Sequence, residues 1–102
     1  MSGNEAFDTA AIDVRKLTEP LPPTELLKLY GLYKVGTGAD ITTAKAPGMF
    51  SLQAKEMRKS WQKVVDRGIS QEEAQNEYIE LVEELKKKYA YDPNKEPEAV
   101  RS

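Results

Sequence analysis

The sequence predicts an all-α protein, built as a single four-helix bundle. Four segments carry apolar residues three and four positions apart, the spacing that places them on one face of a helix, and proline or glycine separates the segments. No segment alternates polar and apolar residues as a half-buried strand does, and no hairpin turn signal appears. With 102 residues, of which 39% are hydrophobic, the chain can bury one modest core. These observations favour one helical domain.

The first helix is expected over residues 6–17, where Phe7, Ala10, Val14 and Leu17 share a face. The segment Pro20-Leu21-Pro22-Pro23 follows. Proline is not tolerated inside a helix but suits its first turn, so this segment ends the first helix and begins the second.

The second helix is expected over residues 23–35. Leucine and tyrosine side chains cover more than half of its circumference, so it must be covered on two sides, by protein or by protein and a ligand. The segment Gly36-Thr37-Gly38-Ala39-Asp40 ends it. Its two glycines do not make a phosphate-binding loop. The third glycine of that motif is missing, and the segment follows a helix rather than a strand. The irregular connection over residues 37–50 is long enough to indicate a functional loop.

The third helix is expected over residues 51–67, with Ser51 as its N-cap, Trp61 on its apolar face and Gly68 after its last residue. The fourth helix begins with Ser70 and Glu73, the pattern of a capping box, and continues to about Tyr89. Residues 92–102 are polar and contain two prolines, which predicts a mobile tail after a domain that spans residues 5–91.

The composition excludes several kinds of chemistry. The chain has no cysteine and no histidine, so it has no disulfide, no thiol nucleophile, no thiolate metal site and no histidine base. There is no secretory signal and no apolar run of about 20 residues that could span a membrane, which predicts a cytoplasmic protein. The net charge of −2 is unevenly distributed, because residues 28–67 carry +5 between acidic flanks of −3 and −4. Such a basic middle segment favours an anionic partner.

The candidate binding residues lie in Tyr30-Gly31-Leu32-Tyr33-Lys34. On a helix, Tyr30, Tyr33 and Lys34 project to the same side. Two aromatic rings and one cation suit a ligand that is flat, partly apolar and anionic. The alternative is that both tyrosines only pack the helix, with their hydroxyls reaching water.

Several separated blocks of the sequence resemble the acyl-CoA-binding protein family. The blocks follow one another in the family's order over roughly residues 5–91. They are the first-helix residues from Phe7 to Leu17, Tyr30-Gly31-Leu32-Tyr33-Lys34, Asp40-Ile41, Pro47-Gly48-Met49-Phe50, Trp61, and the fourth-helix residues from Ala74 to Tyr89. The resemblance implies an up-down-down-up four-helix bundle that binds long-chain fatty acyl-CoA. It implies an intracellular carrier and pool former that is not an enzyme, has no cofactor or metal, and is a monomer. Acyl-CoA-using enzymes or membranes would be transient partners, without stable membrane insertion.

The resemblance also assigns candidate ligand-binding residues. Tyr30, Tyr33 and Lys34 would contact the coenzyme A head group, together with the intervening Gly31 and Leu32. Tyr78 would contribute from the fourth helix, and Arg15 would lie near the entrance for the acyl chain.

The sequence departs from the family at one position of the third helix. The family usually has a phosphate-binding lysine followed by a tryptophan four and three residues before the second tryptophan, and Met57 and Arg58 occupy these positions here. Either Arg58 or Lys55 replaces the missing cation. Alternatively, Met57 packs with Trp61 and the phosphate depends more on Lys34.

Two other classes of function are weaker alternatives. A helical interaction module could dock an acidic or aromatic peptide on the Tyr-Lys face. Thioester hydrolysis would need a nucleophile and a base, which this composition does not readily supply. Nucleic acid is not expected as a partner, because the chain is acidic as a whole and the basic segment is short.

Overall fold

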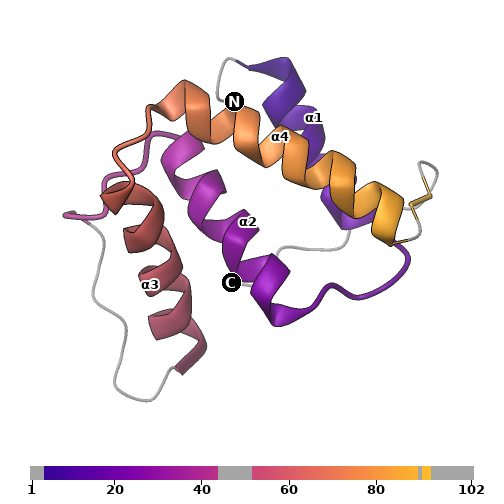
Figure 1. Cartoon of the computed structure of the whole chain (residues 1–102), viewed down its shortest axis with the longest axis horizontal. Coiled ribbons are helices and arrows are strands. Elements are labelled where there is room, and N and C mark those ends of the chain that lie inside the picture. The colour runs from indigo at the N-terminus through magenta and orange to yellow at the C-terminus, as the bar shows by residue number, and fades with distance from the viewer. Residues whose placement is uncertain (1–3, 44–51, 90, 93–102) are drawn as a thin grey trace.

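The structure, a computed structural model, describes residues 4–43, 52–89 and 91–92. It contains four α-helices, α1 (Glu5–Asp13), α2 (Pro23–Gly36), α3 (Leu52–Asp66) and α4 (Gln71–Lys88), and one turn of 3₁₀ helix, η1 (Val14–Lys16), as Figure 1 shows. No strand is present in the described part of the chain, where a single antiparallel bridge joins Leu17 to Tyr91. The all-α, four-helix prediction is confirmed.

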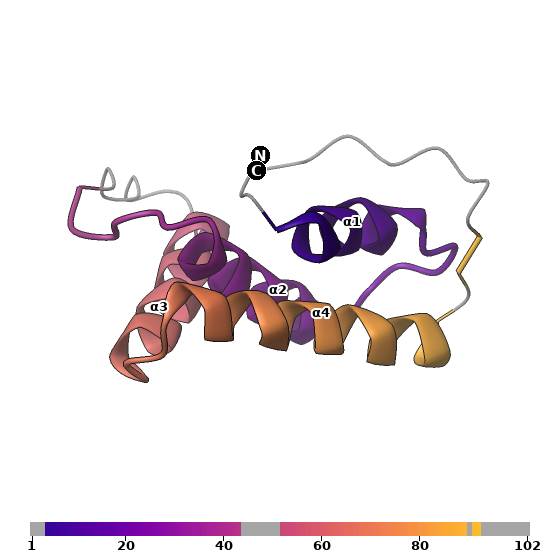
Figure 2. The same cartoon turned by 90° about the horizontal axis from the view of Figure 1, so that it is seen from above.

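Helix α2 lies at the centre of the bundle. It packs against α3 on one side and α4 on the other, and α1 packs on α4. In Figure 1, α2 and α3 run in one direction and α1 and α4 in the opposite one. Figure 2 shows α1 and α3 at different ends of the pair formed by α2 and α4. Because α2 and α3 are parallel neighbours, the end of α2 and the start of α3 lie at opposite ends of the pair, so a short turn cannot join them.

The core lies where α1, α2 and α4 meet. Phe7, Val82 and Leu85 are the largest side chains that are fully buried, and Leu29 and Tyr78 are buried beside them. Each of these side chains contributes about 1.5–3 kcal/mol by leaving water. The core therefore fixes how α2 is held against α4. It thereby also fixes the direction of the α2 side chains that point away from the core.

Local capping accounts for the start of α4. The Ser70 side chain accepts a hydrogen bond from the Glu73 backbone N–H, and the Glu73 carboxylate accepts one from the Ser70 backbone N–H. The predicted capping box is thus confirmed. Gly68 has a φ of 69°, in the left-handed region that favours glycine, as its place after α3 predicts.

Two helix boundaries differ from the predictions. The first helix does not continue as α-helix to residue 17, because α1 ends at Asp13 and tightens into η1. The second helix includes Gly36, and in the segment after it Gly38 has a positive φ of 79°. The Gly36 carbonyl is satisfied from α4, where the side-chain amides of Gln71 and Gln75 donate to it at 3.1 and 2.8 Å. This tertiary contact stabilises the extra residue of the helix.

Some predictions fall on residues outside the described part. They concern the Ser51 N-cap, the segment Pro47-Gly48-Met49-Phe50, and the tail after Asp92. Among the helices that the structure describes, none combines the length and apolar character that crossing a membrane requires.

Candidate functional site

The Lys34 side chain lies over two aromatic rings. Its ammonium nitrogen is 5.6 Å from the centroid of the Tyr30 ring, one turn earlier on α2, and 5.4 Å from that of the Trp61 ring on α3. The two rings meet edge to face, with centroids 6.5 Å apart. Cation–π contacts of this kind contribute from about 0.5 kcal/mol when exposed to about 2 kcal/mol when desolvated, and they restrict where the charge can lie. The arrangement combines a held cation with two π-surfaces.

The Trp61 indole carries a buried hydrogen-bond donor. Trp61 is only 5% exposed, and its Nε1–H has no hydrogen-bond partner within the described residues. A buried donor without a partner costs about 1–3 kcal/mol, so tryptophan N–H groups in folded proteins are usually paired. The Trp61 Nε1–H is itself shielded from solvent, so Trp61 contributes the face of its ring to this arrangement.

Tyr33 belongs to a second aromatic group, made with Phe7 of α1 and Tyr78 of α4. The Tyr33 ring stacks on Phe7 with centroids 5.6 Å apart and lies 5.9 Å from Tyr78. Tyr33 is 37% exposed, whereas Phe7 and Tyr78 are buried. The three candidate side chains of α2 therefore divide, with Tyr30 and Lys34 toward α3 and Tyr33 toward α1 and α4.

Arg15 lies close to this second group. Burial raises the pKa of the Tyr78 phenol well above its ordinary value, nearby Tyr33 adds to the rise, and the positive charge of Arg15 opposes it. The structure thus brings Arg15, Tyr33 and Tyr78 together although they are far apart in sequence. Tyr78 is protonated at any physiological pH and can donate a hydrogen bond.

Gly31 and Leu32 lie in the packed interior. A β-carbon on Gly31 would come within 2.7 Å of the Ser60 carbonyl oxygen and 2.9 Å of Val64 Cγ2, so only glycine lets α2 and α3 approach so closely. Leu32 is 7% exposed and belongs to the core. These positions give both residues a packing role. The direct ligand contact expected for them stays a prediction.

The candidate cations of α3 lie in different surroundings. The Arg58 guanidinium donates a 3.4 Å hydrogen bond to the Ile41 carbonyl, in the loop after α2. That loop is held in a tight turn by Asp40, which accepts hydrogen bonds from the Thr42 hydroxyl and backbone N–H at 2.6 and 2.9 Å. These two hydrogen bonds lower the pKa of Asp40. Lys55 and Met57 are half-buried.

Sequence reasoning missed two residues of the candidate site. The sequence predicts only that Trp61 lies on the apolar face of the third helix and that Phe7 lies on the apolar face of the first. Helical periodicity indicates which residues are apolar but does not show that Trp61 would lie under a cation from another helix. Two signals mark Trp61: it is one of the blocks that resemble the family, and a large ring with an N–H donor needs a polar partner when it is buried.

Comparison with known proteins places the chain in a family. The model of the family described as "Acyl CoA binding protein" matches residues 4–82. The chain is similar to "Acyl-CoA-binding protein homolog 1" of Caenorhabditis elegans, with 45% identity over 84 residues, which cover 82% of this chain and 94% of the relative. It is 42% identical over 87 residues to "Acyl-CoA-binding protein homolog" of Drosophila melanogaster, which covers 85% of this chain and 98% of the relative. The chain belongs to the acyl-CoA-binding protein family.

Proposed function

We propose that this protein binds long-chain fatty acyl-CoA and acts as an intracellular carrier and pool former. The observation that carries the proposal is the placement of Lys34 over the rings of Tyr30 and Trp61 in a chain of this family. The names of its relatives support the same ligand.

The head group of the ligand matches the chemistry of this face. Adenine is a flat π-surface, and stacking a base on an aromatic ring contributes about 1–3 kcal/mol. A phosphate accepts charge-assisted hydrogen bonds from an ammonium group, each contributing about 1.5–3 kcal/mol. The Lys34 ammonium provides the charge, and the rings of Tyr30 and Trp61 provide π-surfaces beside it.

The acyl chain should supply most of the affinity. Each buried methylene contributes about 0.8 kcal/mol, so ten buried methylenes outweigh any single head-group contact. Affinity is therefore expected to rise with chain length until the apolar surface is covered. Tyr33, Tyr78 and Arg15 form the part of the site that we assign to the region where the head group meets the acyl chain.

Lys34 is expected to contribute more to binding the phosphate than the corresponding lysine usually does in the family. Met57 stands where the family has its phosphate-binding lysine, and Arg58 is engaged with the Ile41 carbonyl. Lys34 is held in place by two rings, so it pays little additional ordering entropy when the ligand binds. Lys55 remains the alternative cation.

We further propose a binding protein without catalytic activity, acting as a cytoplasmic monomer that meets acyl-CoA-using enzymes or membranes only transiently. The chain lacks the cysteine and histidine that thioester hydrolysis commonly uses. Incubating the protein with palmitoyl-CoA and measuring thiol release tests this part, since steady release above the buffer rate would contradict it.

Calorimetric titration with palmitoyl-CoA and with free CoA tests the proposed function. Palmitoyl-CoA should bind far more tightly than CoA, because only the ester buries a long apolar chain. Equally weak binding of the two would contradict the carrier proposal. Binding of an acidic peptide with no binding of palmitoyl-CoA would favour an interaction module instead.

A further inference from the structure

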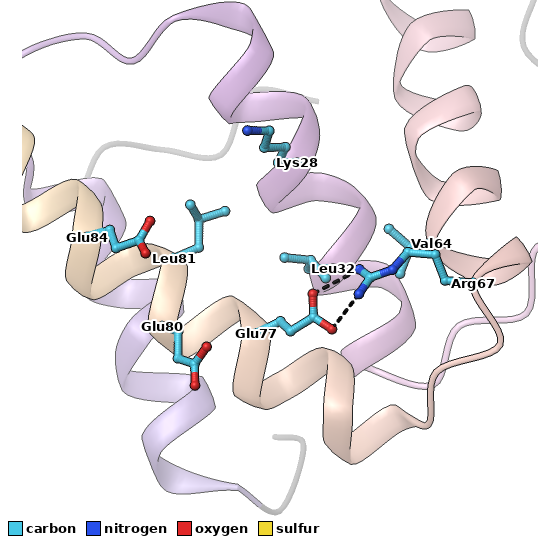
Figure 3. A pocket seen from close by; sticks show the side chains of 8 residues that line it. All are labelled: Lys28, Leu32, Val64, Arg67, Glu77, Glu80, Leu81 and Glu84. Carbon is cyan, nitrogen blue, oxygen red and sulfur yellow. Dashed lines mark hydrogen bonds and ion pairs between the residues drawn. The ribbon is translucent and has the colours of Figure 1, made fainter.

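A groove opens on the face of the bundle where α2, α3 and α4 meet. It has a volume of about 370 Å³ and is drawn in Figure 3. Its apolar lining comes from one residue of each helix, Leu32, Val64 and Leu81. A hollow of this size is at the lower end of the range for ligand sites and accommodates one or two side chains of a docking segment.

The groove is separate from the proposed acyl-CoA site. Successive residues of a helix are about 100° apart, so Leu32 lies about 200° around α2 from Lys34, and Lys28, also in the lining, lies about 200° from Tyr30. The two sites therefore use opposite faces of α2. The test below therefore measures binding at the groove with and without palmitoyl-CoA.

The charges on the rim of the groove are unbalanced. Glu77, Glu80 and Glu84 line it at intervals of three and four residues, which places their carboxylates along one face of α4. Glu77 is neutralised, because both of its oxygens accept 2.8 Å hydrogen bonds from the Arg67 guanidinium, as Figure 3 shows. Within the described part of the chain, Glu80 and Glu84 have neither an ion pair nor a side-chain hydrogen bond.

Glu80 and Glu84 also repel each other. Like charges four residues apart on a helix destabilise it by about as much as opposite charges stabilise it. A cation placed between the two carboxylates would remove this repulsion and gain two ion pairs. Lys28 is the basic residue on the α2 side of the groove. Its Nζ lies 3.9 Å from Glu25 Oε1, and within the described residues it forms no ion pair with Glu80 or Glu84.

We propose that this groove docks a basic amphipathic segment of a partner protein. An apolar side chain of the segment lies on Leu32, Val64 and Leu81, and its lysine or arginine side chains pair with Glu80 and Glu84. The apolar lining favours a peptide over a small polyamine, which would use only the carboxylates. The acidic rim excludes an acidic peptide by repulsion.

The test uses a synthetic capped peptide of leucine and lysine with leucines at helical spacing. Its controls are the same peptide with glutamate in place of lysine, and spermine. Binding is followed through the methyl NMR signals of Leu32, Val64 and Leu81 and quantified by calorimetry. The protein is saturated with palmitoyl-CoA in one series and free in the other, so that the two sites are examined separately.

The charge dependence is tested with matched variants. Glu80→Gln/Glu84→Gln is expected to weaken binding of the lysine peptide about fivefold or more. Glu5→Gln/Glu72→Gln removes the same charge from exposed positions outside the groove and should change binding less than twofold. Both double variants should bind palmitoyl-CoA as the unaltered protein does, and circular dichroism verifies that both remain folded.

Selective shifts of the three groove methyls, lost in the first variant and kept in the second, would support the proposal. Equal weakening by the two variants, equal binding of the glutamate peptide, or shifts outside the groove would overturn it. Spermine binding as tightly as the lysine peptide would also overturn it, because the groove would then be a site for small cations.

Discussion

Replacing Gly31 with alanine tests the close contact between α2 and α3 on which the Lys34 site depends. The new β-carbon would lie 2.7 Å from the Ser60 carbonyl oxygen, whereas ordinary contact begins at 3.4 Å, so the helices must separate by several tenths of an ångström. The obstacle is backbone, which cannot rotate away as a side chain can.

Two opposing effects determine the magnitude of this change. Alanine is a better helix former than glycine by about 1 kcal/mol. Overpacking of a tight contact costs about 1–3 kcal/mol, and we take the upper part of this range, about 2–3 kcal/mol, because the α2–α3 contact is tight at both Ser60 and Val64. We expect a net loss of about 1–2 kcal/mol in the free energy of unfolding, which for a domain of this size lowers the Tm by about 5–10 °C. Because Lys34 and Trp61 lie on the two helices that separate, palmitoyl-CoA binding should weaken several-fold.

Urea unfolding and calorimetry measure the two effects. A companion variant identifies the clashing atom. Val64→Ala removes the Cγ2 atom that would lie 2.9 Å from the new β-carbon, and it leaves the Ser60 carbonyl in place. Gly31→Ala/Val64→Ala should therefore still be less stable than Val64→Ala alone. If Gly31→Ala were as stable as the unaltered protein or more so, helix propensity alone would describe it and the close contact would be refuted.

Three further predictions concern separate parts of the molecule. Ser70→Ala should lower the free energy of unfolding by about 1 kcal/mol in urea titrations, because the capping box is lost; no change would mean that another group caps α4. Asp13 accepts hydrogen bonds from Lys86 and Tyr91 at 2.7 and 3.0 Å. Burial raises its pKa, but these hydrogen bonds and the nearby positive charges outweigh burial and lower it overall. A carboxylate with a lowered folded-state pKa stabilises the fold above its unfolded pKa and loses that contribution as the pH falls toward the folded value. Asp13→Asn should therefore be less stable by about 1–2 kcal/mol at pH 7, and unfolding measured between pH 6 and 3 should show this difference shrinking; a constant difference would contradict the assignment. Met57→Lys should tighten palmitoyl-CoA binding several-fold in calorimetry by supplying a second cation for the phosphate, and unchanged affinity would mean that Lys34 already satisfies it.

Features set by neighbouring residues could be predicted from the sequence, and features set by distant contacts could not. The capping box at Ser70 and the left-handed Gly68 follow from local chemistry, and both are present. The inclusion of Gly36 in α2 depends on amides from α4, which are donated from 35 and 39 positions away.

The end of the first helix also depends on contacts with residues far along the chain. The side chain of Asp13, at the end of α1, is held by Lys86 and Tyr91, 73 and 78 positions further along the chain. Periodicity over residues 6–17 contains no information about those partners. It therefore indicated one continuous helix where the structure has α1 followed by η1.

The sequence predicts the α2 residues of the candidate site, but not which residues of other helices group with them. Helical spacing placed Tyr30, Tyr33 and Lys34 on one side of α2, and the structure divides them according to which helix lies nearby. The partner rings, Trp61 and Phe7, come from α3 and α1. Spacing within one helix cannot specify which side chain of another helix it will meet.

The most direct test of the central claim compares palmitoyl-CoA binding to Lys34→Ala and Lys63→Ala by calorimetry. Both variants remove one positive charge, but only Lys34 lies over the rings of Tyr30 and Trp61, and Lys63 is exposed on α3. We predict that Lys34→Ala weakens binding more than tenfold, the loss of a charge-assisted contact of about 1.5–3 kcal/mol, while Lys63→Ala changes it little. Equal effects of the two substitutions would contradict the assignment of the head group to Lys34.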